Sequence, residues 1–387
     1  MDELKLIEEA NKALVLSNNN PNADRRACNF AVNTMFRIQE KERVVLSSPA
    51  RILWKITGQC NSNCLHCWAS LGNKHYREEL LRVAHEIAEL NVMMVSISGG
   101  EPFMCENLFE VIDILKSKNI IVEIMSNGSL IDEGVAEKLS RVLDLNTDAV
   151  QISLDGSTEM VHDKQRNSKI FDSVIKGIRC LRKYNIPVRA AFCATSINQY
   201  DIFNTYMLAN SLDVQTFSVV PVFRFRKAQL FEKDINSYDY LLEIVKCKNF
   251  ENETTTQLRL HANQFFQYLL NKHYDSLQLD NLFGKLQYDK YVIYPNETNS
   301  SIQIDAQGDV VPGPEWDKNF SGGNVYKENI KEIWEQGLTW KEFRSGRDLS
   351  KTKCAKCKIF PICLGGNMKY AYEKYGTINM PDGTCLV

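Results

Sequence analysis

Six short apolar runs alternate with amphipathic helical segments between residues 51 and 222, and this alternation constrains the fold more than any other feature. The sequence predicts strands near Ile52–Thr57, Met93–Ser98, Ile120–Ser126, Ala149–Leu154, Val188–Thr195 and Thr216–Val222. Helices are expected between them, near Arg77–Leu90, Asn107–Ser117, Gly134–Leu143, Phe171–Tyr184 and Ile202–Ser211. Strands that alternate with helices form a parallel sheet with right-handed crossovers. Because six units are fewer than the eight of a closed barrel, we predict an α/β fold with a partial (β/α)6 barrel.

The rest of the chain predicts three smaller segments around this barrel of residues 50–229. Residues 1–49 have a polar, helical pattern and are expected to form an N-terminal extension. Residues 230–299 are weakly patterned and lean towards helix, which suggests a bridge. Residues 300–387 form a small cysteine-rich C-terminal domain, which begins with a hairpin across Gln307-Gly308.

Composition excludes several classes of protein. The 387 residues are 44% apolar and 24% charged, with a net charge of −2, so no overall field attracts nucleic acid or an anionic membrane. No targeting segment is visible, and no apolar stretch approaches the roughly 20 residues of a membrane span. We therefore expect a cytoplasmic protein with no nucleic-acid or membrane partner. In that reducing compartment its twelve cysteines are not expected to form disulfides.

Three of the cysteines follow the first predicted strand at metal-ligand spacing, as Cys60, Cys64 and Cys67. Thiolates are soft ligands that suit iron–sulfur clusters or zinc. No fourth cysteine is nearby, which leaves one metal position open, as a catalytic cluster requires. A zinc site with His66 as the fourth ligand is the alternative.

Glycine and polar residues follow the next strands in order. The second predicted strand ends in Ser98-Gly99-Gly100-Glu101-Pro102, the third in Ser126-Asn127-Gly128 and the fourth in Ser153-Leu154-Asp155-Gly156. Arg166 comes shortly after the last of these. Two of these features have a plainer interpretation: a strand-to-helix turn for the glycine pair, and an exposed helix-start charge for Arg166. The position of these segments favours a shared active site instead, because active sites of parallel barrels assemble at the C-terminal ends of the strands.

The C-x3-C-x2-C spacing, with an aromatic-type residue before the last cysteine and the strand-end segments in order, resembles the radical S-adenosylmethionine (SAM) superfamily. The resemblance implies that Cys60, Cys64 and Cys67 hold a 4Fe–4S cluster whose open iron binds SAM. It also implies reductive cleavage of SAM to a 5′-deoxyadenosyl radical. The SAM-binding residues that it implies are Gly99, Gly100, Glu101, Ser126, Asn127, Ser153, Asp155 and Arg166. Asn167 departs from the family, which usually has glycine there.

The tail carries four more cysteines, which can close a zinc site or hold a second cluster: Cys354, Cys357, Cys363 and Cys385. With Gln307–Val310, Gly323–Val325 and Ile330–Trp334, this pattern resembles the SPASM domain of radical SAM enzymes. A full SPASM domain holds two auxiliary clusters. Gly313 and Asn367 stand where the first of these needs cysteine, so the resemblance implies a single auxiliary 4Fe–4S cluster on the four tail cysteines.

Two further residues are candidates for the chemistry itself. Cys193, on the fifth predicted strand, could donate a hydrogen atom or be an ordinary buried cysteine. Glu315 follows the position of the missing cysteine and is a candidate general base. Arg224 and Arg226, after the sixth strand, could meet an acidic substrate group or lie in a solvated loop.

The resemblance implies that the chain matures a ribosomally made peptide by forming a thioether or carbon–carbon crosslink, or by epimerisation. The alternative is small-molecule chemistry in tetrapyrrole or carbohydrate biosynthesis. A non-enzymatic iron–sulfur or zinc-binding module is the third possibility, and it would not need the glycine turn, Ser153 or Arg166. The expected partners are a precursor peptide or small-molecule substrate and a flavodoxin- or ferredoxin-type electron donor.

Overall fold

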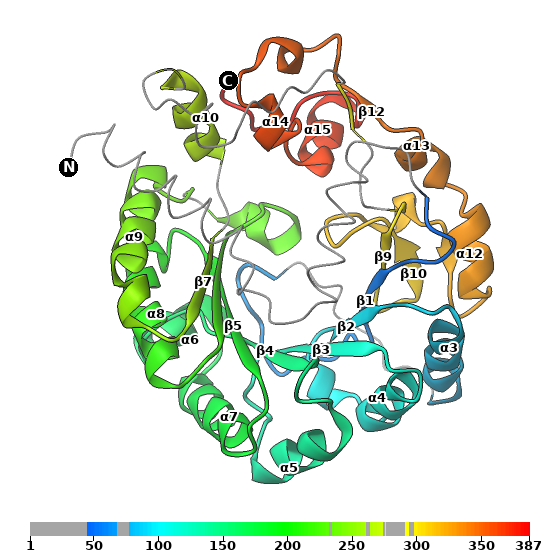
Figure 1. The fold of residues 1–387 in the computed structure, drawn as a ribbon, viewed down its shortest axis with the longest axis vertical. Coiled ribbons are helices and arrows are strands. Elements are labelled where there is room, and N and C mark those ends of the chain that lie inside the picture. The colour runs from blue at the N-terminus through cyan, green and yellow to red at the C-terminus, as the bar shows by residue number, and fades with distance from the viewer. Residues whose placement is uncertain are drawn as a thin grey trace.

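The computed structural model describes residues 45–67, 77–231, 234–260, 264–273, 275, 291–293 and 298–387. Residues 1–44 of the predicted N-terminal extension therefore lie outside the described residues. A curved sheet dominates the structure, with helices along its outer side (Figure 1).

All six predicted strands are present, with ends within two residues of the prediction. They are β1 (Arg51–Lys55), β2 (Met94–Ser98), β3 (Ile121–Ser126), β4 (Ala149–Ser153), β5 (Val188–Ala194) and β6 (Thr216–Pro221). The expected helices follow as α3 (Arg77–Glu89), α4 (Leu108–Lys116), α5 (Glu133–Val142), α7 (Phe171–Lys183) and α8 (Ile202–Ser211). A short helix that the sequence pattern did not predict, α6 (Glu159–Arg166), comes before α7. The strands are nearly continuous apolar runs because helices and the barrel interior bury both faces of the sheet.

The turns from helix to strand share one device. Asn91, Asn119, Asn185 and Asp213 each adopt a left-handed backbone, with φ between 55° and 57°, shortly before β2, β3, β5 and β6 respectively. Asparagine and aspartate tolerate this conformation better than other residues with a side chain, and it ends a helix sharply. Each turn therefore returns the chain to the sheet within a few residues, and the strands enter the sheet from the same end.

The sheet is larger than six strands. In the described part of the chain it has ten strands, in the order β11-β10-β9-β1-β2-β3-β4-β5-β6-β7. At one edge, β7 (Gln257–Leu260) pairs in parallel with β6, although its residues lie in the segment predicted to lean towards helix. At the other edge, the predicted hairpin of β9 (Ser301–Ile304) and β10 (Asp309–Val311) joins the barrel, because β9 pairs in parallel with β1.

The remaining elements belong to the bridge, the C-terminal part and short connecting turns. The bridge contains α9 (Ser237–Phe250), α10 (Gln264–Lys272) and β8 (Val292–Ile293). After the hairpin come β11 (Gly323–Asn324), α12 (Ile330–Gln336), α13 (Trp340–Arg344), β12 (Arg347–Asp348), α14 (Phe360–Cys363) and α15 (Met368–Tyr375). Single turns of 3-10 helix span Pro102–Met104, Gln199–Asp201, Arg226–Leu230, Glu251–Glu253, Lys318–Phe320 and Lys353–Lys356. In Figure 1, α14 and α15 lie between the two ends of the curved sheet.

One apolar core runs through the barrel and into the hairpin region, where it includes Ile304, Val310 and Trp334. The tail adds two small clusters of its own, one around Trp316 and one around Phe360. No helix in the described part of the chain is long and apolar enough to span a membrane. The boundaries proposed at residues 50, 230 and 300 stay predictions, since the sheet itself continues across the last two.

The sheet contains the barrel strands and the C-terminal hairpin. If this shared sheet stabilises both the barrel and the C-terminal part, Ile304→Ala should destabilise the whole protein. Ile304 is fully buried on β9, and truncating such a side chain leaves a cavity that costs about 2–5 kcal/mol. The measurement is the midpoint of urea unfolding followed by circular dichroism. Leu338→Ala is the matched control, because Leu338 is 89% exposed and its truncation should change stability by less than about 0.5 kcal/mol. Equal midpoints for the two variants would refute the structural role of β9.

Candidate functional site

A cavity of about 340 Å³ lies at the C-terminal ends of the barrel strands. Most of the residues predicted to form the site line it: Cys60, Cys64, Cys67, Gly99, Gly100, Ser126, Asn127, Ser153, Arg166 and Cys193. They come from β1 through β5, which are neighbours in the sheet. The positional argument from sequence therefore led to one shared cavity. Glu101, Asp155 and Glu315 are not part of its wall.

The glycine pair after β2 packs against the start of the cysteine loop. A Cβ atom on Gly100 would lie 2.1 Å from the Gln59 carbonyl oxygen, and one on Gly99 would lie 2.5 Å from that of Thr57. The main chains are also bonded, with Gly100 N–H donating to Thr57 O at 2.7 Å. The resemblance implies that these glycines contact SAM, which stays a prediction. In the structure they permit close approach of the cysteine loop itself.

Two other contacts fix the cysteine loop. Asn61 accepts a hydrogen bond from Asn127 Nδ2 at 2.7 Å, which joins the loop to the end of β3. On the opposite side, Leu65 N–H donates to the Gln165 carbonyl oxygen at 3.3 Å, which joins the loop to α6. The cysteine loop is thus held by the segments that follow β2, β3 and β4.

Glu101 is fully buried and braces two strand ends. Its carboxylate accepts hydrogen bonds from Ser126 Oγ and from the main-chain N–H of Asn127, both at 2.7 Å, and from Phe103 N–H at 3.2 Å. Burial raises the pKa of this carboxyl group, and the hydrogen bonds oppose that rise. The predicted contact with a methionine ammonium stays a prediction, while bracing β2 against β3 is what the structure shows.

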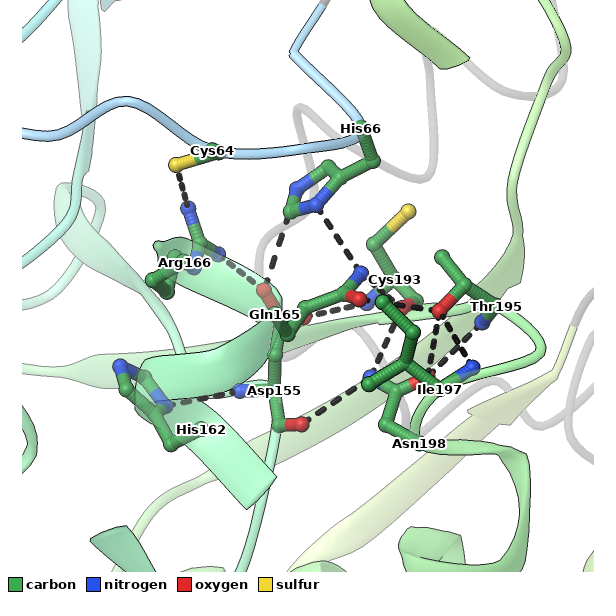
Figure 2. A network of polar contacts seen from close by, with 10 residues as sticks. All are labelled: Cys64, His66, Asp155, His162, Gln165, Arg166, Cys193, Thr195, Ile197 and Asn198. Carbon is green, nitrogen blue, oxygen red and sulfur yellow. Dashed lines mark hydrogen bonds and ion pairs between the residues drawn. The ribbon is translucent and has the colours of Figure 1, made fainter. Parts of the chain in front are cut away.

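Asp155, Arg166 and Cys64 form a chain of contacts beside the cavity (Figure 2). Asp155 Oδ2 lies 2.6 Å from Arg166 Nη2, and Arg166 Nη1 donates to Cys64 Sγ at 3.6 Å. Burial opposes the charge of Arg166, but Asp155, Cys64 and Cys193 together outweigh it, and the pKa of the guanidinium is raised. The buried Nε of Arg166 has no hydrogen-bond partner among the described residues, which leaves a donor for a ligand in the cavity.

A second chain of contacts sets the orientation of His66 (Figure 2). Thr195 Oγ1 donates to Gln165 Oε1 at 2.9 Å, so the Gln165 amide nitrogen faces His66 Nδ1, also at 2.9 Å. Burial lowers the pKa of His66 to about 4. The ring is therefore neutral near pH 7. Nδ1 accepts from Gln165, so the proton lies on Nε2.

Cys193 lines the same cavity, and both its main-chain N–H and its carbonyl group are hydrogen-bonded. Its N–H donates to Asp155 Oδ1 at 2.7 Å, and its carbonyl accepts from Asn198 Nδ2 at 3.0 Å and from Gln165 Nε2 at 3.3 Å. Burial raises the pKa of the Cys193 thiol well above its ordinary value, so it stays protonated. A fixed, neutral S–H group facing the cavity is what a hydrogen-atom donor requires.

The four tail cysteines line a second, separate cavity: Cys354, Cys357, Cys363 and Cys385. Helix α10 lies beside it. Two amide side chains one turn apart on α10 accept from the thiols, Gln267 Oε1 from Cys363 at 3.0 Å and Asn271 Oδ1 from Cys357 at 3.6 Å. Cys354 is buried, and burial raises the pKa of Cys363 to about 12.

The donor sets fit iron–sulfur clusters. Three thiols around one cavity leave an iron open for a ligand, and four around the other satisfy a complete cluster. The cysteines surround these cavities without meeting at one point: no three His, Cys, Asp or Glu side chains in the described ranges converge on a single metal ion. Burial also raises the pKa of Cys60, to about 11, so metal binding at this site is coupled to loss of thiol protons.

Glu315 does not line the first cavity and contacts Asn367, whose Nδ2 donates to Glu315 Oε1 at 3.3 Å. Burial raises the pKa of Glu315, while the positive charges of Lys369 and Lys55 act against that rise. Asn367 also caps α15 by accepting from the N–H groups of Lys369 and Tyr370. Glu315, the candidate base that follows the missing cysteine position at Gly313, therefore meets Asn367, which stands at the other missing position, and neither lines the first cavity.

Three further residues at the site were not predicted from the sequence: Lys55, Gln165 and Asn198. Lys55 ends β1, is 5% exposed and lines the cavity, and a lysine inside an apolar strand run was a visible signal. Asn198 lies just past the end of β5, so the strand-end argument could have found it. Gln165 gave no local signal, since its partners come from the cysteine loop and from β5.

Comparison with protein families gives two matches. Residues 54–199 match the family described as the radical SAM superfamily. Residues 296–358 match the SPASM family, described as an iron–sulfur cluster-binding domain. The first match begins within β1, continues past β5 and covers most of the residues that line the cavity. The second covers the hairpin and the first two tail cysteines, so iron–sulfur is favoured over zinc.

Curated proteins and solved structures that resemble this chain match it over most of its length. The chain is 24% identical over 357 residues to Fe-coproporphyrin III synthase of Methanosarcina barkeri, covering 87% of each protein. It is 25% identical over 368 residues to mycofactocin maturase MftC of Mycobacterium tuberculosis, covering 90% of this chain and 86% of that protein. Streptococcus suis SuiB bound to its precursor peptide SuiA has a similar fold, with a TM-score of 0.71 at 18% identity, over 92% of this chain and 80% of SuiB.

Two cavities with three and four cysteines predict about eight irons per reconstituted chain, as two 4Fe–4S clusters. The triple variant Cys60→Ala/Cys64→Ala/Cys67→Ala should retain about half of this iron, measured by colorimetric assay after anaerobic reconstitution. Cys180→Ala, on α7, is the matched control and should bind as much iron as the unmodified protein. Bound zinc in place of half the iron would contradict the assignment of the tail cysteines.

Proposed function

We propose that this chain, an enzyme of the radical SAM superfamily with a C-terminal SPASM domain, modifies a residue of a ribosomally made precursor peptide. The observation that carries the proposal is the part of the cavity lining that comes from β3 to β6 and the two residues after β6. This part of the lining is uncharged and includes Met125, Gln151, Ala191, Phe192, Cys193, Val220, Pro221, Val222 and Phe223. Such a wall suits a single peptide side chain beside its neutral main chain.

The same wall argues against a tetrapyrrole with several carboxylates. Lys55, His66 and Arg166 are the basic side chains among the described lining residues, and Arg166 is already paired with Asp155. Arg224, which we considered for an acidic substrate group, is paired with Asp234 instead. Fe-coproporphyrin III synthase has a similar sequence, so this alternative is worth a direct test.

When bound, the catalytic cluster and SAM supply a 5′-deoxyadenosyl radical that abstracts hydrogen, and the auxiliary cluster supplies one-electron transfer. The chain's own residues position these reactants. Ser153, Arg166 and the strand-end residues Ser126 and Asn127 lie on the cavity wall where we propose that SAM binds. Val222 and Phe223 extend the wall beyond β6 and help to exclude water from the reacting carbon.

Two reaction classes remain, and they depend on different cysteines: the four tail cysteines for a crosslink and Cys193 for epimerisation. A crosslink removes a second hydrogen as a proton and an electron, so the electron needs an acceptor at the site of Cys354, Cys357, Cys363 and Cys385. Epimerisation instead returns a hydrogen atom to the substrate radical: the S–H bond of Cys193 breaks, the C–H bond forms, and the resulting thiyl radical takes up an electron and a proton. We favour the crosslink, because four protein ligands complete the auxiliary centre and suit it to electron transfer.

The electron for SAM cleavage comes, in this proposal, from a flavodoxin- or ferredoxin-type donor in the cytoplasm. The cysteines of the described residues are free thiols, which is compatible with that reducing location.

The direct test is an anaerobic reaction with SAM, a reductant and one candidate substrate at a time. We expect 5′-deoxyadenosine to accumulate with short peptides encoded beside the gene, and mass spectrometry should find a peptide that has lost a pair of hydrogens. Iron coproporphyrin III should stay unchanged in a parallel reaction. Conversion of the tetrapyrrole without any change in the peptides would overturn the proposal in favour of the alternative.

The variants Cys363→Ala and Cys193→Ser separate the two reaction classes. For a crosslink, folded Cys363→Ala should still cleave SAM but make no product, whereas Cys193→Ser should make product normally. For epimerisation, Cys193→Ser should lose inversion, measured by deuterium uptake from heavy water into the peptide. Normal product from Cys363→Ala lacking the auxiliary cluster would remove the electron-transfer role.

A further inference from the structure

The loop that follows β6, residues 222–231, connects the first cavity with two other parts of the chain, and we call it the β6 loop. Its first two residues, Val222 and Phe223, line the cavity. The Phe223 side chain is 37% exposed, although most large apolar side chains of the barrel are buried. The contacts that hold the β6 loop therefore determine where an accessible aromatic ring lies at the cavity.

One set of contacts comes from the C-terminal part of the chain, through Tyr370 on α15. The main-chain N–H of Arg224 donates to Tyr370 Oη at 2.7 Å. The ring of Phe225, which is only 3% exposed, stacks on the Tyr370 ring with centroids 4.5 Å apart. Helix α15 lies between the two ends of the curved sheet (Figure 1), so it can contact a loop that leaves β6. Tyr370 thus holds the β6 loop with both its hydroxyl group and its ring.

The β6 loop is also held at two other points. The Arg224 guanidinium pairs with Asp234 and donates to the Phe231 carbonyl oxygen, which closes the loop on itself. Lys227 Nζ donates to Asn63 Oδ1, which joins the loop to the cysteine loop. The segment beside the cavity is therefore fixed from the tail and from the cysteine loop.

The ring of Phe223 continues the stack that Tyr370 begins. It lies nearly parallel to the Phe225 ring, at an angle of 6° with centroids 6.4 Å apart. Three aromatic side chains thus follow one another from α15 to the cavity. An aromatic ring that is already fixed offers apolar contact area and loses little conformational entropy when a ligand binds.

The place of Phe223 in the sheet favours a contact with substrate over a contact with SAM. The residues that we propose for SAM binding follow β2, β3 and β4 or lie on α6, whereas Phe223 follows β6, two strands beyond β4. Its neighbours in the lining, Pro221 and Val222, are apolar as well. An apolar group of the substrate therefore matches this end of the cavity.

We propose that Phe223 binds an apolar or aromatic side chain of the precursor peptide, next to the residue that is modified, and that Tyr370 is the positioning residue that holds Phe223 in place. This inference rests on the proposed function, since it assumes a peptide substrate. It gives the C-terminal part a role in substrate recognition that is separate from the chemistry of its four cysteines.

The first test measures steady-state kinetics of the reconstituted full-length protein with the encoded precursor peptide. Phe223→Ala should raise KM for the peptide about tenfold with little change in kcat, because it removes apolar contact area in the bound state. Formation of 5′-deoxyadenosine without peptide should stay unchanged. Phe250→Ala is the matched control, because Phe250 is 39% exposed but lies on α9, where its ring contacts Phe203.

A set of peptides identifies the side chain that Phe223 contacts. Each apolar residue that flanks the modified residue is replaced with alanine in turn. One of these peptides should have a KM about tenfold higher with the unmodified protein, but no further loss with Phe223→Ala, because the two changes remove the same contact.

The second test removes only the hydroxyl group of Tyr370. Tyr370→Phe should speed hydrogen–deuterium exchange at the Arg224 N–H, measured by mass spectrometry on fragments of residues 222–231 without SAM or peptide. It should also raise the peptide KM about threefold, the effect of losing one hydrogen bond. Tyr372→Phe, on the same helix, is the control and should change neither quantity, because its ring packs in the cluster around Trp316.

A peptide KM that is unchanged in Phe223→Ala, or a raised KM for SAM in its place, would overturn the binding role. Unchanged exchange at Arg224 in Tyr370→Phe would overturn the positioning role. If the unmodified protein modifies no peptide at all, the proposed function fails and the binding role fails with it. Normal modification of the peptide by the unmodified protein, with variants that behave like their controls, would remove this inference alone.

Discussion

Strand β1 is paired on both sides, and the arrangement of the two cysteine sites depends on this. On one side it pairs with β2, whose glycine turn packs against the cysteine loop that leaves β1. On the other side it pairs with β9, the first strand of the C-terminal hairpin. A shift of β1 by one residue would turn its side chains to the opposite faces of the sheet, so this register also decides whether Lys55 faces the cavity. The same ladder of main-chain hydrogen bonds thus connects the cysteine loop to the C-terminal part that carries the four tail cysteines.

Both cysteine sites place a buried arginine near the thiols, and the two arginines are held differently. Arg166 is paired with Asp155 and donates directly to Cys64. Arg347 donates to the main-chain carbonyl oxygens of Gly365 and Gly366, just after Cys363. Each arginine thus connects a cysteine-bearing segment to another part of the fold, Arg166 from α6 and Arg347 from β12.

Local sequence patterns predicted the strands well because burial on both faces makes each strand a compact apolar run. They also located the strand-end residues, since parallel strands end at one edge. What the patterns could not supply were partners distant in sequence. The carboxylate of Glu101 bonds to Ser126 and Asn127 on the neighbouring strand, and Gln165 orients His66 from 99 residues away. Strand β7 was missed because four residues, Gln257–Leu260, are too few to display a period among helical neighbours.

Asn367 stands at one of the two positions where the first auxiliary cluster of a full SPASM domain needs cysteine. Its side chain caps α15 through two main-chain donors, and such a cap contributes about 1 kcal/mol to stability. Its amide nitrogen donates to Glu315, and its N–H donates to Asp382, which also contacts the Cys385 turn. Cysteine at this position would lose the cap and leave the partly buried Glu315 carboxylate without that donor. The residue that stands where a ligand of a first auxiliary cluster is expected therefore supports the second site, so its replacement has a structural consequence whatever cluster content the chain proves to have.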